Sequence, residues 1–271
     1  MKVDLKTAFN PTHTFECGQC FRWNVNDNGV YIGISDGKVC RVDMREIICK
    51  KEDEPYWENY FALDTDYAQI DSRLLKCDSK LKPCIEYGSG IRILRQSLWE
   101  TIISFIISAN NNIPRIKKII EKMCELFGDE VVSDGEKYYA FPTPKKISEL
   151  TLEDLAPLKA GYRDKYILDA ANKVHNKLVD LDAVSGMDDI AAKKELMKIK
   201  GVGGKVADCI LLFSLGRSSV FPTDVWIKRI LTEQYGVPDK EIPKFVTQMY
   251  GELSGYAQQY LYYYYRSISD K

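Results

Sequence analysis

The segment LMKIKGVGGKVADCILL, residues 196–212, decides the fold of this chain. Helical spacing ends near Ile199, the turn Gly201-Val202-Gly203 follows, and a second helix is predicted to begin near Gly204 or Lys205. Glycine tolerates positive φ and lets another backbone approach closely. The free N–H groups that begin the second helix, beside its positive dipole end, suit one phosphate of a nucleic acid backbone. Such a contact positions a nucleic acid and reads no base.

Composition limits the class of protein. The chain has 271 residues, of which 45% are hydrophobic and 28% charged, so it can bury a core and is neither disordered nor a small disulfide scaffold. Its 38 Lys and Arg nearly balance its 39 Asp and Glu, so any basic surface must be local. Two lysine- and arginine-rich clusters, 115–122 and 193–205, favour a polyanion on one face, although charge runs are more often solvated helix faces.

Neither a signal peptide nor a membrane span is expected. The first ten residues lack an apolar core, and the longest apolar runs, 101–109 and 206–215, fall short of the roughly 18–20 residues of a span. We therefore expect a soluble, cytoplasmic protein whose eight cysteines are thiols.

The cysteine pattern gives little support to a metal site. Cys17 and Cys20 form one CxxC motif with His13 upstream, but no second CxxC completes a zinc site. A zinc site completed by a single cysteine such as Cys40 is the less favoured alternative. No cysteine follows Cys209, which excludes a C-terminal iron–sulfur cluster.

The first third of the chain predicts an antiparallel β-meander. Aromatic and β-branched residues are enriched in FRWNV, GVYIGIS and GKVCRVDMR, with Asn28-Gly29 and Asp36-Gly37 as hairpin turns. The meander continues through REIICKK, 45–51. From Pro55 the spacing becomes helical over 56–75, and Asp64 is placed like an N-cap.

Nearly everything from Arg92 onward predicts helix. A strongly apolar helix is expected over 92–109, and an amphipathic helix over 113–127 with Pro114 in its first turn and Gly128 as its stop. Further helices are predicted at 152–160, 163–178, 187–199, 206–215 and 225–235 and in the Tyr-rich tail. The fold class is therefore α+β, with a β domain and flanking helix over 1–85 and a helical domain over 86–271.

These segments resemble a known family. GVGGKVADC at 201–209 and PTDVW at 222–226 are similar to the helix-hairpin-helix motif and the aspartate segment of DNA glycosylases. ECGQCFRW at 16–23 is similar to the SGQSFRW segment of 8-oxoguanine DNA glycosylases. Further matches follow in family order at 60–70, 88–96, 105–116, 160–166 and 255–262. The chain thus resembles an 8-oxoguanine DNA glycosylase and abasic-site lyase, and its lack of long insertions favours a microbial member.

The resemblance implies two catalytic residues. Lys205 matches the Schiff-base lysine of the family, and burial together with the positive helix end is expected to lower its pKa, since only the neutral amine is a nucleophile. Without the resemblance, the sequence around Lys205 fits a lysine that contacts a phosphate as well as it fits a nucleophile. Asp224 precedes a helical pattern like an N-cap, and it matches the carboxylate that stabilises positive charge on the sugar. No metal or organic cofactor is expected for this chemistry.

The resemblance also implies a pocket for the damaged base. 8-Oxoguanine carries N7–H where guanine has an acceptor, and Gly18 matches the glycine whose carbonyl faces that position. Gln258 matches the amide that reads the Watson–Crick edge. Tyr262 and Cys209 match the residues on the two faces of the base, although the residues alone predict ordinary core packing for both.

A third set of matches concerns the opposite strand and the DNA backbone. Four residues match those that fill the vacated space and contact the estranged cytosine, namely Asn110, Arg115, Tyr162 and Arg163. Without the resemblance, 110–112 is simply a polar helix break. Gly201, Gly203 and Gly204 would contact a phosphate, and the carbonyls of Met197, Ile199 and Val202 are candidates for a structural cation.

Three residues depart from the family pattern. Trp226 stands where eukaryotic members commonly have His, Cys20 replaces Ser, and Tyr262 replaces Phe. These differences concern phosphate contact and base selectivity rather than the type of reaction.

The expected partner is double-stranded DNA with 8-oxoguanine opposite cytosine, bound by a monomer without a membrane. The expected reaction is base release through a Lys205 Schiff base and strand nicking by β-elimination. One alternative is a monofunctional alkylbase DNA glycosylase, whose members lack the hairpin lysine. The other is a non-catalytic helix-hairpin-helix DNA-binding protein, which needs neither Asp224 nor a base pocket.

Overall fold

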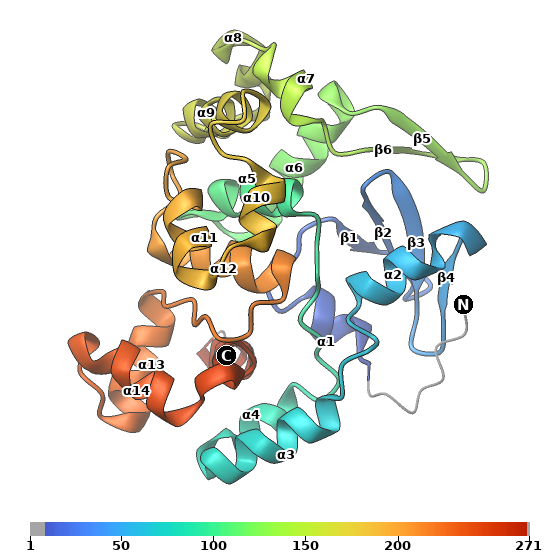
Figure 1. Cartoon of the computed structure of the whole chain (residues 1–271). Coiled ribbons are helices and arrows are strands. Elements are labelled where there is room, and N and C mark those ends of the chain that lie inside the picture. The colour runs from blue at the N-terminus through green and yellow to red at the C-terminus, as the bar shows by residue number, and fades with distance from the viewer. Residues whose placement is uncertain (1–8, 270–271) are drawn as a thin grey trace.

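The N-terminal part of the structure is a four-stranded antiparallel sheet. The computed structural model describes residues 9–269 (Figure 1), so residues 1–8, on which the expectation of no signal peptide rests in part, lie outside it. The predicted meander is confirmed, and neighbouring strands pair in chain order: β1 (Trp23–Val25), β2 (Tyr31–Ser35), β3 (Lys38–Val42) and β4 (Ile47–Cys49). Positive φ at Gly29, Asp36 and Gly37 shows that the Asn-Gly and Asp-Gly turns form as predicted.

One face of this sheet buries an aromatic core. Trp23 of β1 stacks on Phe15 of α1 (Pro11–Phe15) with ring centroids 4.1 Å apart, and it meets Trp57 of α2 (Glu54–Tyr60) edge to face. A Cβ on Gly33 of β2 would lie 2.5 Å from the Trp23 ring, so only glycine fits beneath this indole.

The largest core surrounds α5 (Leu98–Ser108). Every residue of α5 from Trp99 to Ile107 is buried, which confirms the prediction of a helix buried all round. It packs against α6 (Ile113–Phe127), α9 (Arg163–His175) and α12 (Gly204–Leu215). Short helices complete this part: α7 (Pro144–Ser148), α8 (Leu152–Leu155), α10 (Leu181–Gly186) and α11 (Asp189–Leu196).

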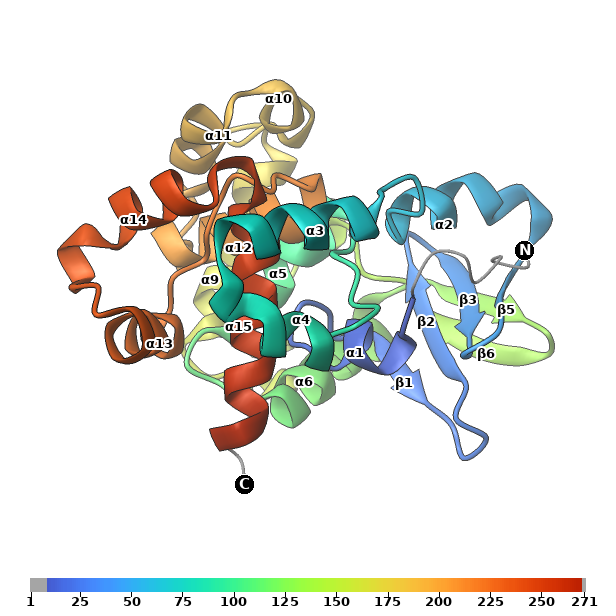
Figure 2. The same ribbon diagram turned by 90° about the horizontal axis from the view of Figure 1, so that it is seen from below.

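A further core joins distant parts of the chain. Side chains of α3 (Tyr67–Cys77) and α4 (Lys82–Tyr87) pack with those of α13 (Val225–Tyr235), α14 (Ile242–Met249) and α15 (Ser254–Ser269). Figure 2 shows α4 lying against α15. The domain boundary at residue 85 stays a prediction. In the described part of the chain, no helix is long and apolar enough to cross a membrane.

Two helical predictions before residue 110 were wrong. The helix expected over 56–75 is broken at 61–66, and Asp66 rather than Asp64 caps α3 by accepting from Gln69 N at 3.0 Å. Asp64 is engaged by Arg95 instead. The helix expected from Arg92 begins only at Leu98. Residues 92–96 form neither helix nor strand because their backbone groups bond elsewhere, as when Gln96 N donates to the Phe213 carbonyl.

The sequence prediction also missed a hairpin. Strands β5 (Glu130–Ser133) and β6 (Glu136–Tyr139) pair across an Asp134-Gly135 turn, whose Asp-Gly dipeptide was an available signal. Arg41 of β3 binds Asp134 and Glu136, so the hairpin is tied to the sheet. Three later helices are also shorter than predicted: α9 ends at His175, α11 spans only Asp189–Leu196 after its N-cap Asp188, and α8 gives way to a 3₁₀ turn at 156–158.

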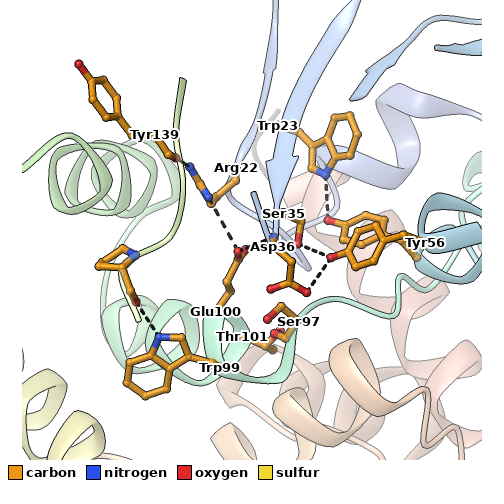
Figure 3. Close-up of polar contacts among 12 residues, drawn as sticks. Arg22, Trp23, Ser35, Asp36, Tyr56, Ser97, Trp99, Glu100, Thr101 and Tyr139 are labelled. Atoms are coloured by element: carbon orange, nitrogen blue, oxygen red, sulfur yellow. Dashed lines mark hydrogen bonds and ion pairs between the residues drawn. The ribbon is translucent and has the colours of Figure 1, made fainter. Parts of the chain in front are cut away.

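A buried glutamate joins the sheet to the central helix (Figure 3). Glu100, in the first turn of α5, accepts hydrogen bonds from Asp36 N at 3.1 Å and Ser35 Oγ at 3.4 Å, and the Arg22 guanidinium lies 3.9 Å away. Tyr56 completes the network by donating to Ser35 Oγ at 2.8 Å. Burial raises the pKa of the Glu100 carboxyl to about 7, against the lowering effect of Arg22.

This raised pKa makes folding stability depend on pH. The folded protein holds a proton that the unfolded chain releases near its ordinary pKa of about 4.3, so the wild type loses stability as pH rises from about 4 through 7. Glu100→Gln is neutral at every pH, so its stability relative to wild type should improve by roughly 2 kcal/mol between about pH 5 and about pH 8. Urea unfolding at both pH values measures this. Glu153→Gln, at an exposed first-turn position of α8, is the control, and an equal change at both pH values would contradict the prediction.

Candidate active site

The glycine turn between α11 and α12 has the geometry of an anion site. Gly201 has φ +86°, and a Cβ there would lie 2.6 Å from the Tyr166 ring. Gly203 is the N-cap of α12 and supplies no side-chain cap, so the first amides of α12 meet no side-chain acceptor in the described chain. Gly201 and Gly203 are exposed, which leaves these amides open to a phosphate oxygen.

Charged side chains hold this hairpin in shape. Asp169 of α9 accepts from Lys200 N at 2.8 Å, and Lys173 donates to the Lys198 carbonyl at 2.6 Å. Lys193 of α11 pairs with the buried Asp208 of α12 at 2.8 Å. Part of the basic cluster at 193–205 therefore has a structural role, which its charge pattern did not show.

One cavity gathers six of the residues singled out in the sequence. It is lined by the two proposed catalytic residues, Lys205 and Asp224, and by all four proposed base-binding residues, Gly18, Cys209, Gln258 and Tyr262. These come from the loop after α1, from α12, from the start of α13 and from α15. The cavity measures about 40 Å³, which is room for a few water molecules, so a purine can enter only if a wall residue moves.

Sequence reasoning missed other walls of this cavity. Phe105 of α5, Phe213 of α12 and Gln259 of α15 also line it. Phe105 stacks on Phe213 with ring centroids 5.6 Å apart, and the Lys205 ammonium lies 5.7 Å from the centre of the Phe105 ring. All three residues lie in or near segments that match the family, but nothing local distinguishes them from core residues.

The expected low pKa of Lys205 was wrong for the free protein. Burial lowers the pKa of the amine, but the Cys209 side chain, which hydrogen-bonds to it, and the Asp224 carboxylate raise it, and the net shift is upward. Burial also raises the pKa of the Cys209 thiol to about 11, so this thiol is uncharged at neutral pH. Lys205 is therefore an ammonium at neutral pH in the free protein.

Asp224 and Gln258 are two polar residues of the cavity wall, and they differ in their hydrogen bonding. Asp224 caps α13, as predicted, by accepting from Ile227 N at 2.8 Å through Oδ1. Gln258 is 5% exposed, and its Oε1 has no hydrogen-bond partner among the described residues. An unpaired buried amide oxygen is costly unless a ligand or water completes it, so Gln258 is available to a base with a donor edge.

Gly18 lies directly against Tyr262. Its φ is +84°, and a Cβ at this position would be 3.4 Å from Tyr262 Cε1. A side chain at residue 18 would therefore be strained and would fill the space between the loop and this ring. Burial raises the pKa of the nearby Cys17 thiol to about 12 and that of Cys20 well above its usual range, so both are thiols.

The residues proposed for the opposite strand gather elsewhere, where α5 ends beside the start of α9. Asn110 has φ +50° and follows α5. Arg163 is buried, donates to the carbonyls of Ala109, Asn110 and Ala160, and lies 4.5 Å from the Tyr162 ring. Arg115 donates to the Lys159 carbonyl at 3.0 Å, and Tyr162 is half exposed. In the free protein, both arginines donate hydrogen bonds to backbone carbonyls.

Comparison with protein families decides the assignment. A model described as 8-oxoguanine DNA glycosylase, N-terminal domain, matches residues 2–102, and a model described as HhH-GPD superfamily base excision DNA repair protein matches residues 103–253. The chain belongs to the 8-oxoguanine DNA glycosylase family.

Individual members of this family are similar over most of the chain. N-glycosylase/DNA lyase of Saccharomyces cerevisiae is 30% identical, covering 83% of this chain and 68% of its own length. N-glycosylase/DNA lyase OGG1 of Arabidopsis thaliana is 31% identical, covering 92% of this chain and 75% of its own length. A solved structure of the 8-oxoguanine glycosylase/lyase of Clostridium acetobutylicum contains double-stranded DNA with cytosine opposite 8-oxoG. That protein is 42% identical, the match covers 97% of this chain and 93% of that chain, and the TM-score is 0.92.

The hairpin of this family member gives a test of phosphate binding. A Cβ at Gly203 meets nothing within 4 Å, so Gly203→Ala should fold normally. If a phosphate contacts the amides of this turn, the added methyl group narrows its approach, and we expect about a tenfold loss of affinity for duplex DNA. Fluorescence anisotropy measures this loss, with Gly186→Ala, at another position with open space, as the control. Equal affinity of the two variants would refute phosphate contact at this turn.

Proposed function

We propose that the cavity around Lys205 is where this member of the family excises 8-oxoguanine opposite cytosine. The enzyme is a bifunctional DNA N-glycosylase and abasic-site lyase of base excision repair. The observation that carries the proposal is the convergence of Lys205, Asp224 and the four base-binding candidates on one cavity. We also propose that a monomer acts on duplex DNA in the cytoplasm or nucleoid.

The first step releases the base. The damaged nucleotide leaves the base stack and displaces a wall of the cavity, such as Tyr262. Lys205 gives up a proton and its amine attacks C1′ of the sugar, while the C1′–N9 bond breaks and its electron pair leaves with the base. The base takes up one proton, so charge is conserved. Asp224 stabilises the positive charge that grows on the sugar and draws the Lys205 ammonium toward it.

The second step cuts the strand. The C1′–O4′ bond opens, its electron pair stays on O4′ and takes up the proton that the attached amine loses, and a Schiff base forms between Lys205 and C1′. Loss of a proton from C2′ then expels the 3′ phosphate by β-elimination, which nicks the DNA. Hydrolysis of the Schiff base frees the amine of Lys205 for another turnover.

Recognition of the lesion uses the other cavity residues. We propose that the Gly18 carbonyl accepts from N7–H of 8-oxoguanine and that Gln258 pairs with its Watson–Crick edge. Tyr262 and Cys209 would contact the two faces of the base. On the opposite strand, Asn110, Arg115, Tyr162 and Arg163 would contact cytosine after the arginines exchange backbone carbonyls for its acceptors.

The hairpin also suits a structural cation. Among the described residues, the Met197 and Val202 carbonyls accept no hydrogen bond outside the regular helices, whereas the Ile199 carbonyl accepts from Val202 N at 3.1 Å. A cation bound by these three carbonyls would lie beside the bound phosphate and offset its charge.

Substitution of Lys205 tests the nucleophile. Lys205→Gln should show no covalent band when borohydride is added with 8-oxoguanine:cytosine duplex and no base release or nicking, yet it should bind the duplex. Lys240→Gln, on the surface between α13 and α14, is the control and should react like wild type. Trapping or base release by Lys205→Gln would exclude this mechanism. Base release without trapping by the wild type would favour a monofunctional glycosylase, and binding alone would favour a non-catalytic DNA-binding protein.

Substitution of Asp224 separates its two roles. Asn can cap a helix as Asp does, so Asp224→Asn should keep the folding stability of wild type. Loss of the carboxylate should slow single-turnover base release about 100-fold, the usual scale for one electrostatic group at a transition state. Asp66→Asn, at the cap of α3, is the matched control and should change neither quantity. A full rate for Asp224→Asn would limit residue 224 to capping.

A further inference from the structure

The carbonyls on either side of Gly18 are each held by a glutamine side chain. Gln259 Nε2, from α15, donates to the Cys17 carbonyl at 3.1 Å. Gln96 Nε2, from the segment before α5, donates to the Gln19 carbonyl at 2.8 Å. The Gly18 carbonyl lies between these two held carbonyls in the chain.

Both glutamines are themselves held in place. Gln259 is 2% exposed and lines the cavity. Gln96 also donates to the Phe213 carbonyl, through Nε2 at 3.2 Å and through its backbone N at 2.9 Å. The contact on the Cys17 carbonyl therefore comes from α15, which also carries Gln258 and Tyr262. Gln96, which holds the Gln19 carbonyl, is bonded to Phe213 near the end of α12, the helix that carries Lys205.

The side chain of Gln19 anchors the same loop to the core. It is fully buried, its Nε2 donates to the carbonyls of Thr14 and Arg92 at 2.9 and 2.7 Å, and its Oε1 accepts from Leu94 N at 2.9 Å. The loop thus stays fixed in the core whichever way a single peptide within it is turned.

This arrangement limits the direction of one carbonyl. A peptide unit is planar, so a bound carbonyl orients the whole unit. Holding the units that contain the Cys17 and Gln19 carbonyls fixes the two α-carbons that flank the unit of the Gly18 carbonyl. That carbonyl can then turn only about the line joining these two atoms, and Gly18 has φ +84° in this arrangement.

We propose that Gln259 and Gln96 are positioning residues that aim the Gly18 carbonyl at N7–H of the lesion. This inference rests on the proposed function of the cavity. A hydrogen bond weakens steeply when its angle leaves the linear range, so a rotated Gly18 carbonyl would no longer distinguish 8-oxoguanine from guanine. Neither glutamine touches the base through this contact, and both act through Gly18.

The test compares two substrates of the same enzyme. Gln259→Met and Gln96→Met remove an amide donor while keeping a side chain of similar length. One duplex carries 8-oxoguanine opposite cytosine, and the other carries a preformed abasic site opposite cytosine, which has no base for Gly18 to read. The measured quantity is the rate of base release from the first duplex divided by the rate of nicking of the second.

We expect each variant to lower this ratio about tenfold, which is the scale of one lost hydrogen bond. The matched control is Asn172→Leu, which removes an amide that donates to the Leu168 carbonyl at 2.9 Å on α9, and it should leave the ratio unchanged. Thermal unfolding shows that each variant is folded at the assay temperature, and either glutamine can carry the test if the other variant unfolds.

The outcomes separate this inference from the function beneath it. Equal losses on both duplexes, which leave the ratio unchanged, would mean that the glutamines only stabilise the fold. Unchanged rates on both duplexes would mean that they do not aim the carbonyl. Either result overturns the inference while leaving the enzyme an 8-oxoguanine glycosylase. Failure of the wild type to release 8-oxoguanine would instead overturn the proposed function itself.

Discussion

The burial of α12 along most of its length is the constraint on which the site depends. Residues 206–214 are all buried, and the helix packs against α5 at the centre of the largest core. Since its body is enclosed, only its first turn reaches the surface, and there the glycine turn leaves amides open to DNA. Lys205, in this first turn, and Cys209, one turn further along, both line the cavity. A single packed helix therefore places both the glycine turn proposed to bind DNA and the lysine proposed as the nucleophile.

The local parts of this arrangement could be predicted from the sequence. Glycines that need a positive φ, the Asp224 cap and the strand turns are each specified by a few neighbouring residues, and they were predicted correctly. Asp64 was chosen over Asp66 because both precede the same helix, and only the approach of Arg95 separates them. The grouping of Gly18, Lys205 and Gln258 came from the family resemblance, because no local pattern links residues so far apart.

Features that depend on distant partners escaped prediction. Residues 92–96 have helical spacing, but Gln19, Tyr60 and Phe213 take their backbone hydrogen bonds and keep them out of a helix. The pKa of Lys205 was expected to fall because burial was considered without Cys209 and Asp224, which come close only in the folded chain. Nothing in the sequence around Gln259 indicates that its side-chain amide donates to the Cys17 carbonyl, because the two residues meet only in the folded chain.

The small size of the cavity has a consequence for the search along DNA. The cavity has room for only a few waters, so under the proposed function every base that enters must first supply the free energy that moves a wall residue aside. That cost reduces the occupancy of all bases equally, but a base that gains no compensating contact returns to the stack sooner. A pocket this small would therefore shorten the dwell time on intact nucleotides and let the enzyme examine long stretches of undamaged genome between lesions.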